Sequence, residues 1–484
     1  MSTTRRIHAV SPCAETLAPG IAAIKQEMNL PTAFSEEVEA AAKRAAANPR
    51  LPERDCTDIA FVTIDPAGAM DLDQAMFVER RGEGYRVHYA IADVAAFVST
   101  GDPIDLEANR RGETLYGADS KVPLHPKVLS EGAASLLPNQ IRPALLWTID
   151  LDHTGEGIAV DVRRARVKSR AKLDYESLQA RIDGGDDDPM WNTLRKIGEL
   201  RVQREQRRGG ISLPLPEQEI RIDGGCWQLE FRARHPLDSW NEQISLLTGM
   251  AAAHLMTQAK VGILRTLPPP FDGAIERLRR TARALDIAWG KALSYPDFIR
   301  TLDPTNPRHI AMMTNCTTVL RGAGYAAFDG KLPDQPLHSA LASTYSHATA
   351  PLRRLVDRYV GETCVAICAN QSIPDWVLRA LPTLPATMGE SSRRASRFEH
   401  AVIDLAEATM LEKQVGDRFI GSVVEIDRRD GRNGVVMLHD PAIEATVSAD
   451  APLTLGERVE ATLIEADPAT RRIRFSCATR AASV

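Results

Sequence analysis

The type of secondary structure that the sequence predicts changes twice along the chain. After a helical start, apolar or alternating segments of strand length occur at 59–64, 85–91 and 145–151, and another begins at residue 160. Amphipathic helical patterns then dominate, at 191–208, 237–260, 274–289, 353–369 and 393–413. Short strands return after residue 415. This order predicts an α+β fold, in which a mixed sheet with helices precedes a separate all-β unit.

The C-terminal strands are short and closely spaced. They are predicted at 419–426, 434–438, 443–447, 458–465 and 472–476, with turns rich in glycine, aspartate and proline between them. This spacing predicts a small antiparallel barrel of the OB-fold type. We therefore expect a helical N-terminal lead at 1–57, a large α+β domain at 58–370, a helical connector at 371–414 and the barrel at 415–484.

The composition is that of a globular protein, with 44% apolar and 25% charged residues. The 59 basic and 64 acidic residues give a formal charge of −5, which excludes a uniformly basic coat but not a local basic surface. No apolar window is long enough to predict a membrane span. The seven cysteines form no CxxC pair, so we expect reduced thiols and a cytoplasmic location.

Three aspartates follow the first predicted strand. Asp65 ends that strand, and Asp71 and Asp73 come after a turn that contains Pro66 and Gly68. Carboxylates at i and i+2 of an extended chain point the same way, and close carboxylates repel one another unless a cation neutralises them. The pattern therefore favours a divalent cation, and Mg²⁺ is the usual ion where phosphate supplies other ligands. A turn that merely contains aspartates and a structural calcium loop are the alternatives.

A cationic segment lies near residue 350. Pro351 suits the first turn of a helix with Thr349 as its N-cap. Arg353 and Arg354 would then lie near the positive end of that helix, which attracts phosphate. The alternative is a solvated helix start whose arginines pair with Asp357, and the spacing alone does not decide between the two.

Residues 162–172 (VRRARVKSRAK) form a strand of unusual polarity. Successive cations on one face would lie about 7 Å apart, two residues of strand rise each, which suits a polyanion backbone. They are Arg164, Arg166, Lys168, Arg170 and Lys172. Because this face carries no acidic residue of its own, we favour a nucleic acid as its ligand over a solvated sheet face.

Four segments of the chain resemble known motifs in one fixed order. They are FVTIDPAGAMDLDQA (61–75), VPLHPKVLSEGAASL (122–136), VKSRAKLDYE (167–176) and YSHATAPLRRLVD (345–357). The first resembles the aspartate motif of the ribonuclease II (RNB) exoribonucleases, and the last resembles the arginine motif of the same family. The C-terminal strands resemble the ribosomal S1-like RNA-binding barrel that ends these enzymes. The resemblance therefore covers most of the chain.

The resemblance implies a hydrolase that degrades single-stranded RNA from its 3′ end and releases 5′-nucleoside monophosphates. One or two Mg²⁺ ions, or Mn²⁺ in their place, would be bound by Asp65, Asp71, Asp73 and Gln74 and would orient the attacking water. Asp73 and Arg353 would be the catalytic residues, with Arg353 on the scissile phosphate, where it offsets developing charge.

The resemblance also implies the RNA contacts. Tyr116 matches a tyrosine that stacks on the 3′-terminal base, and Tyr175 matches one that contacts the ribose 2′-OH. Arg354, Glu242 and the five cations of the basic strand are expected to bind RNA as well. Apart from the resemblance, two interpretations of the barrel arginines stay open, phosphate contacts or simple solvation at the surface, for Arg418, Arg428, Arg429 and Arg432. We expect single-stranded RNA as the partner, no membrane and a monomer.

Several positions depart from the family pattern. Gln74 stands where the motif usually ends in a second aspartate, and Leu213 stands where an aromatic residue usually partners the stacking tyrosine. Ala350 replaces a serine, Gln243 replaces a glutamate, and the lead is too short for two cold-shock barrels. Gln74 and Leu213 motivate one alternative, a catalytically weak or silent family member that binds RNA. Another is a metal-dependent phosphodiesterase that acts on small nucleotides.

Overall fold

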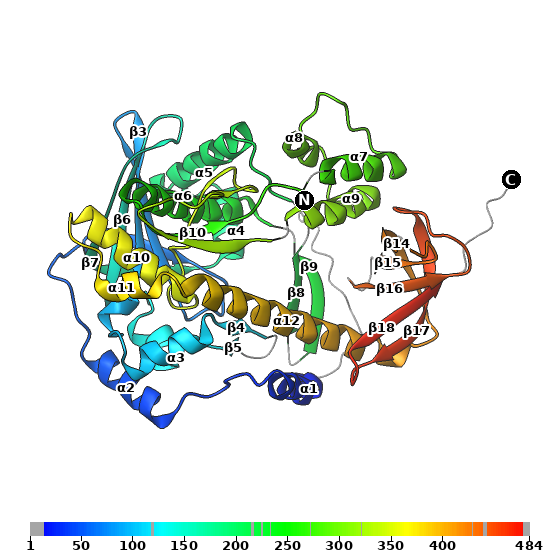
Figure 1. Ribbon diagram of the computed structural model, residues 1–484, viewed down its shortest axis with the longest axis horizontal. Coiled ribbons are helices and arrows are strands. Elements are labelled where there is room, and N and C mark those ends of the chain that lie inside the picture. The colour runs from blue at the N-terminus through cyan, green and yellow to red at the C-terminus, as the bar shows by residue number, and fades with distance from the viewer. Residues whose placement is uncertain are drawn as a thin grey trace.

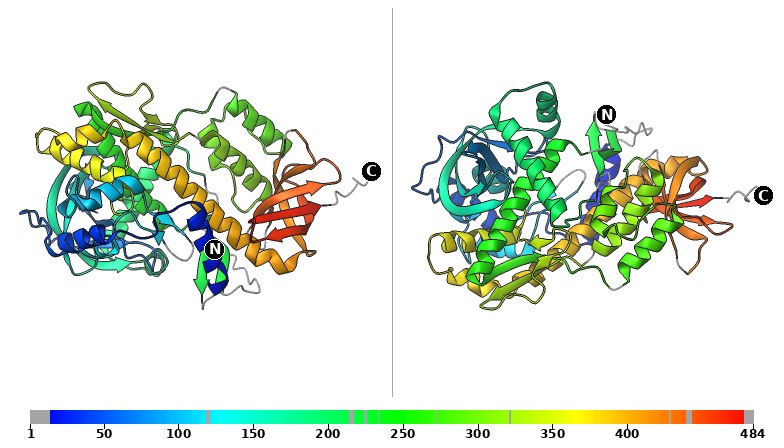
Figure 2. Two further views of the ribbon diagram at one scale, coloured as in Figure 1. Left: turned by 60° about the horizontal axis from the view of Figure 1, so that its bottom comes forward. Right: turned by 90° about the horizontal axis from the view of Figure 1, so that it is seen from above.

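The computed structural model describes residues 14–117, 121–213, 217–223, 226–232, 234–271, 273–320, 322–427, 429–438 and 443–477. Figure 1 shows a larger and a smaller lobe joined by a long helix, α12 (Leu384–Leu411), which begins in the larger lobe and ends beside the C-terminal strands. The rotated views in Figure 2 show the same arrangement. Within the described ranges, no helix is long and apolar enough to cross a membrane.

The larger lobe is built around a closed barrel with the strand order β1-β2-β3-β6-β7. The strands are β1 (Phe61–Ile64), β2 (Gln74–Arg81), β3 (Gly84–Ala92), β6 (Ile141–Leu151) and β7 (Gly157–Leu173). Neighbouring strands pair antiparallel except β1 and β7, whose parallel pairing closes the barrel. The α+β class is therefore confirmed, and its mixed sheet is closed into a barrel.

Strand β2 was not predicted from the sequence pattern. Met76 and Val78 are buried in the core, but the strand ends in the charged run Glu79 to Arg81, which weakens its apolar signal. A two-residue turn then leads to β3, and Gly82 in that turn has a φ of 58°. Glycine suits this position because tight hairpin turns require a positive φ.

Helices surround the barrel and share its apolar core. The helices are α2 (Glu36–Ala47), α3 (Pro103–Arg111), α4 (Tyr175–Asp183), α5 (Pro189–Arg207), α6 (Pro236–Ala259), α10 (Leu355–Cys368) and α11 (Asp375–Ala380). Trp147 of β6 lies fully buried in one core cluster with Ile244 of α6 and Val360 of α10. Apolar residues of facing elements thus fix the barrel against its helices.

Short paired strands lie outside this barrel. They are β4 (Leu115–Tyr116) with β5 (Lys121–Val122), β8 (Glu217–Asp223) with β9 (Cys226–Arg232), β10 (Val261–Thr266) with β11 (Gly324–Asp329), and β12 (Leu337–His338) with β13 (Ser343–Thr344). The β4–β5 pair matters for the site described below, because Tyr116 and Lys121 lie directly opposite each other in it.

A helical subdomain stands between the larger lobe and the C-terminal barrel. It comprises α7 (Ala274–Ala284), α8 (Tyr295–Arg300) and α9 (Pro307–Thr317). Its core includes Phe298, which stacks on Trp289 with ring centroids 3.9 Å apart. The helix predicted at 274–289 ends earlier, at Ala284, because Asp286 takes a positive φ of 56° that no helix continues.

The predicted N-terminal lead contributes helices to different cores. α1 (Ala14–Glu27) packs on α12, where Leu17, Ile21 and Leu405 share a buried cluster. α2, by contrast, packs with residues of the first barrel and buries Val38. Ser35 caps α2 as expected and accepts a hydrogen bond from the Val38 N–H.

The C-terminal strands form a second closed barrel with the order β14-β15-β16-β18-β17. The strands are β14 (Arg418–Ile426), β15 (Asn433–Leu438), β16 (Glu444–Ala449), β17 (Arg458–Asp467) and β18 (Arg472–Cys477), which lie within two residues of the predicted bounds. β16 and β18 pair parallel, so the barrel is not purely antiparallel as predicted. Phe419 and Phe475 pack edge to face in its interior, 5.6 Å apart.

Candidate active site

The loop between β1 and β2 carries the three aspartates to one end of the first barrel. The Asp65 N–H bonds to the carbonyl of Leu173, where β7 ends, and the Asp73 carbonyl accepts the N–H of Ala92, where β3 ends. Between Asp71 and Asp73, Leu72 is fully buried. The loop is therefore anchored at both ends. Asp71 and Asp73 flank the buried Leu72, in agreement with the alternation that the i, i+2 spacing predicted.

Asp73 is buried beneath the arginine segment. Its side chain accepts a hydrogen bond of 2.7 Å from the Leu352 N–H, and its Oδ2 lies 3.5 Å from Nε of Arg353. Burial raises the pKa of Asp73 to about 8, although Arg353 and the Leu352 N–H act in the opposite direction. Segments almost three hundred residues apart in sequence thus place a carboxyl and a guanidinium together.

Asp65 shares two charged neighbours with Asp73, because Arg353 and Asp71 act on the pKa of both carboxyls. Burial raises the pKa of Asp65 to about 6, while the Lys172 ammonium and the Arg353 guanidinium oppose the shift. Its Oδ2 is buried and has no hydrogen-bond partner among the described residues. A buried carboxylate oxygen without a partner is costly, and a divalent cation is a ligand that would satisfy it.

Asp71 is already paired within the protein. Its carboxylate lies 2.7 Å from the Lys121 ammonium and accepts a hydrogen bond of 3.3 Å from the Tyr116 hydroxyl. In the part of the chain that is described, no group of three or more His, Cys, Asp or Glu side chains is arranged to hold a metal ion. In this arrangement, the side chains that fit a divalent cation are those of Asp65 and Asp73.

Gln74 is held at both ends of its amide. Its Nε2 donates to the Thr349 carbonyl at 2.6 Å, and its Oε1 accepts from the Tyr89 hydroxyl at 2.7 Å. The side chain therefore ties β2 to the arginine segment and to β3. A metal-ligand role for Gln74, which the resemblance implies, would share an oxygen that already accepts a hydrogen bond.

The consecutive arginines have different surroundings. Arg354 forms a tight ion pair with Asp357, whose carboxylate also accepts the Ala350 N–H at 2.8 Å. The Arg353 side chain is 48% exposed and points to Asp73. The pairing with Asp357, left open by the sequence, therefore holds for Arg354 and not for Arg353.

The predicted helix start at Thr349 and Pro351 is wrong. α10 begins at Leu355, and Arg354 stands before it with an extended backbone. These residues pair with the segment 112–114. The Arg353 carbonyl accepts a hydrogen bond from the Thr114 N–H, and the Leu355 N–H donates to the Gly112 carbonyl. Asp357 caps the turn from inside the helix, so the arginines precede the helix instead of lying in its first turn.

The basic strand does not present an open row of cations. Arg164 lies 3.0 Å from Asp93 and also pairs with Glu362, and Arg166 lies 3.2 Å from Asp55. Arg170 donates to the carbonyls of Thr57 and Asp58, and Lys172 donates to those of Ala67 and Ala69. Among the described residues, Lys168 has no such partner. The acidic and carbonyl partners come from other segments, which the strand's own alternation could not reveal.

The other residues that were predicted to contact RNA have different surroundings. Tyr116 is 48% exposed at the aspartate loop. Tyr175 begins α4 and its hydroxyl accepts a hydrogen bond of 2.6 Å from Asn241. Glu242 lies on α6 and pairs with Arg234 at 2.9 Å. Leu213, expected to partner Tyr116, packs instead against the core of the helical subdomain.

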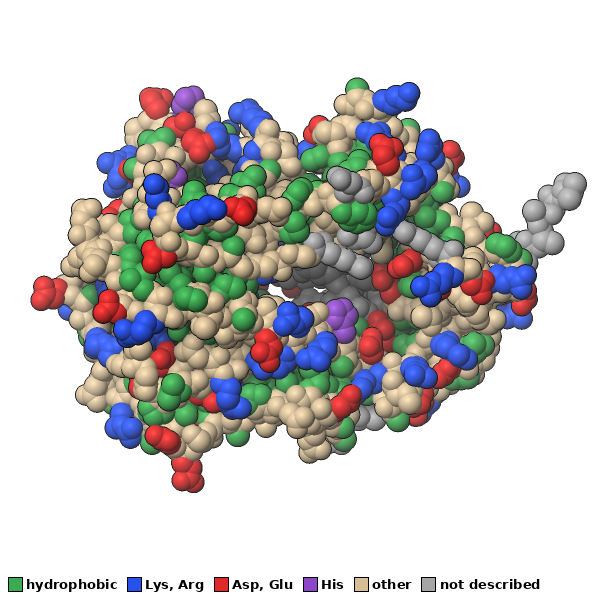
Figure 3. All heavy atoms as spheres, viewed as in Figure 1, with side chains coloured by type: hydrophobic (Ala, Val, Ile, Leu, Met, Phe, Trp, Pro, Cys, Tyr) green, Lys and Arg blue, Asp and Glu red, His purple; other side chains and the backbone are tan. Residues whose placement is uncertain are grey.

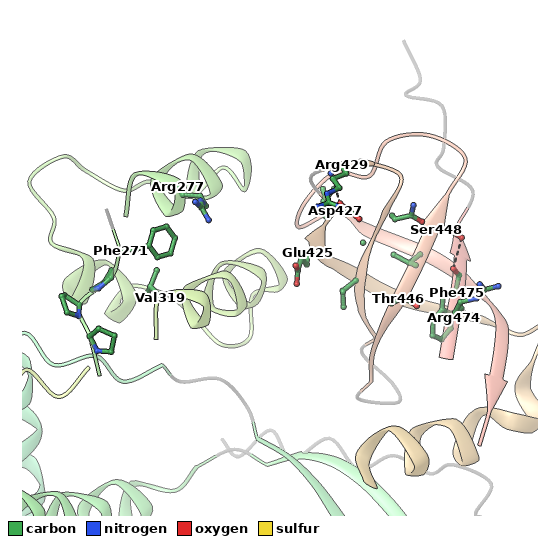
Figure 4. Close-up of a pocket in the computed structure, with 18 residues that line it drawn as sticks. Phe271, Arg277, Val319, Glu425, Asp427, Arg429, Thr446, Ser448, Arg474 and Phe475 are labelled. Carbon is green, nitrogen blue, oxygen red and sulfur yellow. Dashed lines mark hydrogen bonds between the residues drawn. The ribbon is translucent and has the colours of Figure 1, made fainter. Parts of the chain in front are cut away.

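A cleft of about 1190 Å³ lies between the helical subdomain and the C-terminal barrel. Figure 4 shows Phe271 and Arg277 on one side of it, and Arg429 and Thr446 on the other. Phe271 is 53% exposed, and the Arg277 guanidinium lies 5.0 Å from its ring. Of the barrel arginines predicted to contact phosphate, Arg429 lines this cleft, whereas Arg428 lies outside the described residues. On the face in Figure 3, acidic and basic side chains are interspersed.

Sequence reasoning missed some residues that the structure brings to these sites. Lys121 was overlooked, although it lies in the TLYGADSKVP stretch that supplies Tyr116. Its place shortly after Tyr116 was the available signal, but only the β4–β5 pairing brings it to Asp71. Phe271 and Arg277 follow a proline run and carried no recognisable motif.

Comparisons with known proteins identify the family to which the chain belongs. The family model described as the RNB domain matches residues 53–369, and the model of the RNase II-type exonuclease C-terminal S1 domain matches residues 417–478. The match covers more than half of the chain. The chain belongs to the RNB-domain family.

The relatives include ribonuclease R enzymes. Ribonuclease R of Escherichia coli K12 is 26% identical over 493 residues, which cover 92% of this chain and 60% of that protein. Ribonuclease R of Mycoplasma genitalium is 25% identical over 403 residues, or 77% of this chain and 54% of that protein. The chain thus spans little more than half of the length of these curated relatives.

Solved structures share the fold. Mycoplasma genitalium RNase R in complex with ribose methylated single-stranded RNA superposes with a TM-score of 0.83 at 21% identity, over 94% of this chain and 77% of that one. Yeast Ssd1, a pseudonuclease, superposes with a TM-score of 0.72 at 16% identity, over 93% of this chain and 57% of that one. The fold is therefore found both in an RNase R and in a pseudonuclease.

Proposed function

We propose that this chain is a 3′→5′ exoribonuclease that hydrolyses single-stranded RNA with Mg²⁺ or Mn²⁺ and releases 5′-nucleoside monophosphates. The observation that carries the proposal is the meeting of Asp73 with Arg353, 3.5 Å apart, at the end of the first barrel. The RNB-domain match and the ribonuclease R relatives support the reaction class.

Asp65 and Asp73 would hold the divalent cation, with Asp71 joining them once its partners release it. Asp65 offers a buried oxygen that has no hydrogen-bond partner among the described residues, and Asp73 offers its Oδ2, which lies 3.5 Å from Nε of Arg353. A cation bound here would generate a nucleophilic water near neutral pH and offset charge on the leaving 3′ oxygen. The protein itself fixes the positions of these carboxylates through the anchored β1–β2 loop.

Arg353 would contact the scissile phosphate. Its half-exposed guanidinium is aimed at the carboxylate end of the barrel, while Arg354 is held back by Asp357. A guanidinium offers several N–H donors to phosphate oxygens in a bidentate geometry. Negative charge that develops during hydrolysis would be stabilised there.

RNA would be held on both sides of this centre. The exposed ring of Tyr116 is available to stack on the terminal base, and Tyr175 is proposed to contact its ribose. Phe271, Arg277 and Arg429 give the cleft a stacking ring and two cations, which are the groups that bind single strands. We propose single-stranded RNA as the partner of a monomeric, cytoplasmic protein.

A catalytically weak or silent RNA-binding protein is the second candidate. Lys121 occupies Asp71, Gln74 is engaged at both ends of its amide, and the fold is shared with a pseudonuclease. The Lys121 pair reduces the negative charge that Asp71 offers to a cation, and the oxygen of the Gln74 amide already accepts a hydrogen bond. The buried carboxyls of Asp65 and Asp73, which lie in the field of Arg353, favour the enzyme.

An assay on 5′-labelled single-stranded RNA distinguishes the candidates. With Mg²⁺ the full chain should shorten the RNA progressively from its 3′ end, and EDTA or Asp73→Asn should abolish the ladder. RNA binding without shortening would refute the enzyme and support the silent binder. Cleavage of dinucleotides with no action on longer RNA would support the small-nucleotide phosphodiesterase instead.

A further inference from the structure

Lys121 links the aspartate loop to a segment that the proposed reaction does not use. Its ammonium lies 2.7 Å from the Asp71 carboxylate and 2.9 Å from the Glu131 carboxylate. Glu131 belongs to the helical segment Leu129–Ala133, which contacts the first barrel where the Arg142 side chain of β6 donates to the Gly132 carbonyl. The Lys121 and Asp71 side chains are only 20% and 12% exposed. A half-enclosed ammonium between two carboxylates is a strong electrostatic contact.

The same carboxylate also holds Tyr116. Tyr116 and Lys121 face each other across the β4–β5 pair, and both contact Asp71, the tyrosine through its hydroxyl at 3.3 Å. Asp71 thus anchors both strands of the pair. Any ligand that takes Asp71 away from the pair must release both contacts together.

We propose that Lys121 is a positioning residue, which occupies Asp71 as an internal cation until a divalent cation competes for that carboxylate. The inference rests on the proposed function, in which Asp71 becomes a metal ligand. When Asp71 turns to the divalent cation, Lys121 stays with Glu131 and the Tyr116 hydroxyl loses its acceptor. Metal binding and the freedom of the Tyr116 ring are therefore coupled, and coupling between binding sites is reciprocal. An RNA 3′ end that draws Tyr116 away from Asp71 would raise the affinity for the cation.

The first experiment measures the affinity for Mn²⁺ alone, by electron paramagnetic resonance on the full chain without RNA. Lys121→Met keeps the length of the side chain and removes its charge, and should tighten the Kd about tenfold, a common size for coupling between sites. Lys121→Gln, which keeps a hydrogen-bond donor, should tighten it less and replaces the methionine variant if that one misfolds. Adding Asp71→Asn to Lys121→Met should remove the gain.

The matched control is Lys172→Met. Lys172 lies near Asp65 and donates to the carbonyls of Ala67 and Ala69, so its loss removes the same charge without touching Asp71.

The second experiment follows Tyr116 by ¹⁹F NMR of 3-fluorotyrosine protein, with the resonance assigned by its loss in Tyr116→Phe. Mg²⁺ should shift this resonance in the wild type and in Lys172→Met, and should not shift it in Asp71→Asn.

The outcomes separate this inference from the function on which it rests. A wild-type Mn²⁺ site that Asp73→Asn abolishes, with an unchanged Kd in Lys121→Met, overturns the role of Lys121 and leaves the proposed metal site standing. A Tyr116 resonance that ignores Mg²⁺ while Mn²⁺ binds also overturns it. Absence of Mn²⁺ binding in every variant overturns both the coupling and the metal requirement of the proposed function.

Discussion

The first barrel and the C-terminal barrel are closed in a similar way, yet they differ in what their loops bury. In each, one parallel pair joins antiparallel strands, β1 with β7 in the first and β16 with β18 in the second. The β1–β2 loop of the first barrel buries carboxyl groups, and the pKa values of Asp65 and Asp73 rise. In the C-terminal barrel the turn acid Asp467 is partly exposed, and hydrogen bonds from Thr470 and Ala469 lower its pKa.

This difference shows how similar barrels can serve separate tasks. Burial disfavours the ionised form of a carboxyl group, so a bound cation or a proton stabilises it strongly. Catalytic sites commonly use carboxyl groups in this condition. An exposed, hydrogen-bonded carboxylate only stabilises a turn. We therefore expect chemistry at the end of the first barrel and RNA contacts at the cleft beside the second.

The largest expected effect comes from removing the buried acid. Asp73→Asn should lower kcat for RNA hydrolysis by about 10³-fold or more, because one carboxylate of the cation site is lost. The matched change in the C-terminal barrel, Asp467→Asn, should leave kcat nearly unchanged. Steady-state rates on single-stranded RNA test the pair, and equal losses in both variants would remove the distinction between the barrels.

The consecutive arginines should separate activity from stability. Arg353→Gln should lower kcat by about 10²-fold, since it removes a charge-assisted contact to phosphate, and should leave the free energy of unfolding nearly unchanged. Arg354→Gln breaks the pair with buried Asp357 and should lower that free energy by about 3 kcal/mol. Urea unfolding and rate measurements check both variants, and the reverse pattern would assign the catalytic position to Arg354.

The buried carboxyls of the first barrel should make metal-free stability depend on pH. The folded-state pKa of Asp73 is about 8, above its ordinary value, so its contribution is complete below that ordinary value and is lost as pH rises toward 8. Between pH 6 and 8 this carboxyl should lower the free energy of unfolding by at most about 1.4 kcal/mol per pH unit. Urea unfolding in EDTA at pH 6, 7 and 8 should show this slope, and Asp73→Asn should flatten it. An identical slope in both proteins would assign the effect to other groups.

The smallest expected effects come from the cleft. Arg429→Ala and Arg277→Ala should each weaken binding of single-stranded RNA by roughly fivefold, and each should reduce the salt slope of log K by about 0.7 for a lost phosphate contact. Fluorescence anisotropy across a salt series measures both. Arg418, which pairs with Glu460 on the C-terminal barrel, provides the control, and its replacement by alanine should matter less. An unchanged salt slope in both cleft variants would place the RNA elsewhere.

The sequence predicted local features more reliably than the partners of charged side chains. The C-terminal strands and the alternation of Asp71, Leu72 and Asp73 depend on neighbouring residues, and they agree with the structure. The closure of β1 on β7 depends on a parallel pairing of distant segments, which no local pattern encodes. The distinction between Arg353 and Arg354 likewise requires Asp357 to fold back on the turn.

The basic strand shows the same limit for charge. Its alternation was predicted from local spacing, but Arg164 is paired with acids on other elements. Lys121 illustrates the converse, because an unremarked lysine reaches the site through strand pairing. A charge in a sequence therefore indicates a ligand only after its partners in the fold are known.

Hydrolysis in ¹⁸O-labelled water tests the central claim most directly. The full chain is incubated with single-stranded RNA and Mg²⁺, and the released products are identified by mass spectrometry. We predict 5′-nucleoside monophosphates that carry one ¹⁸O in the phosphate from wild type, and none from Asp73→Asn. Intact RNA with the wild type, or mononucleotides released equally by Asp73→Asn, would contradict a hydrolytic centre at the end of the first barrel.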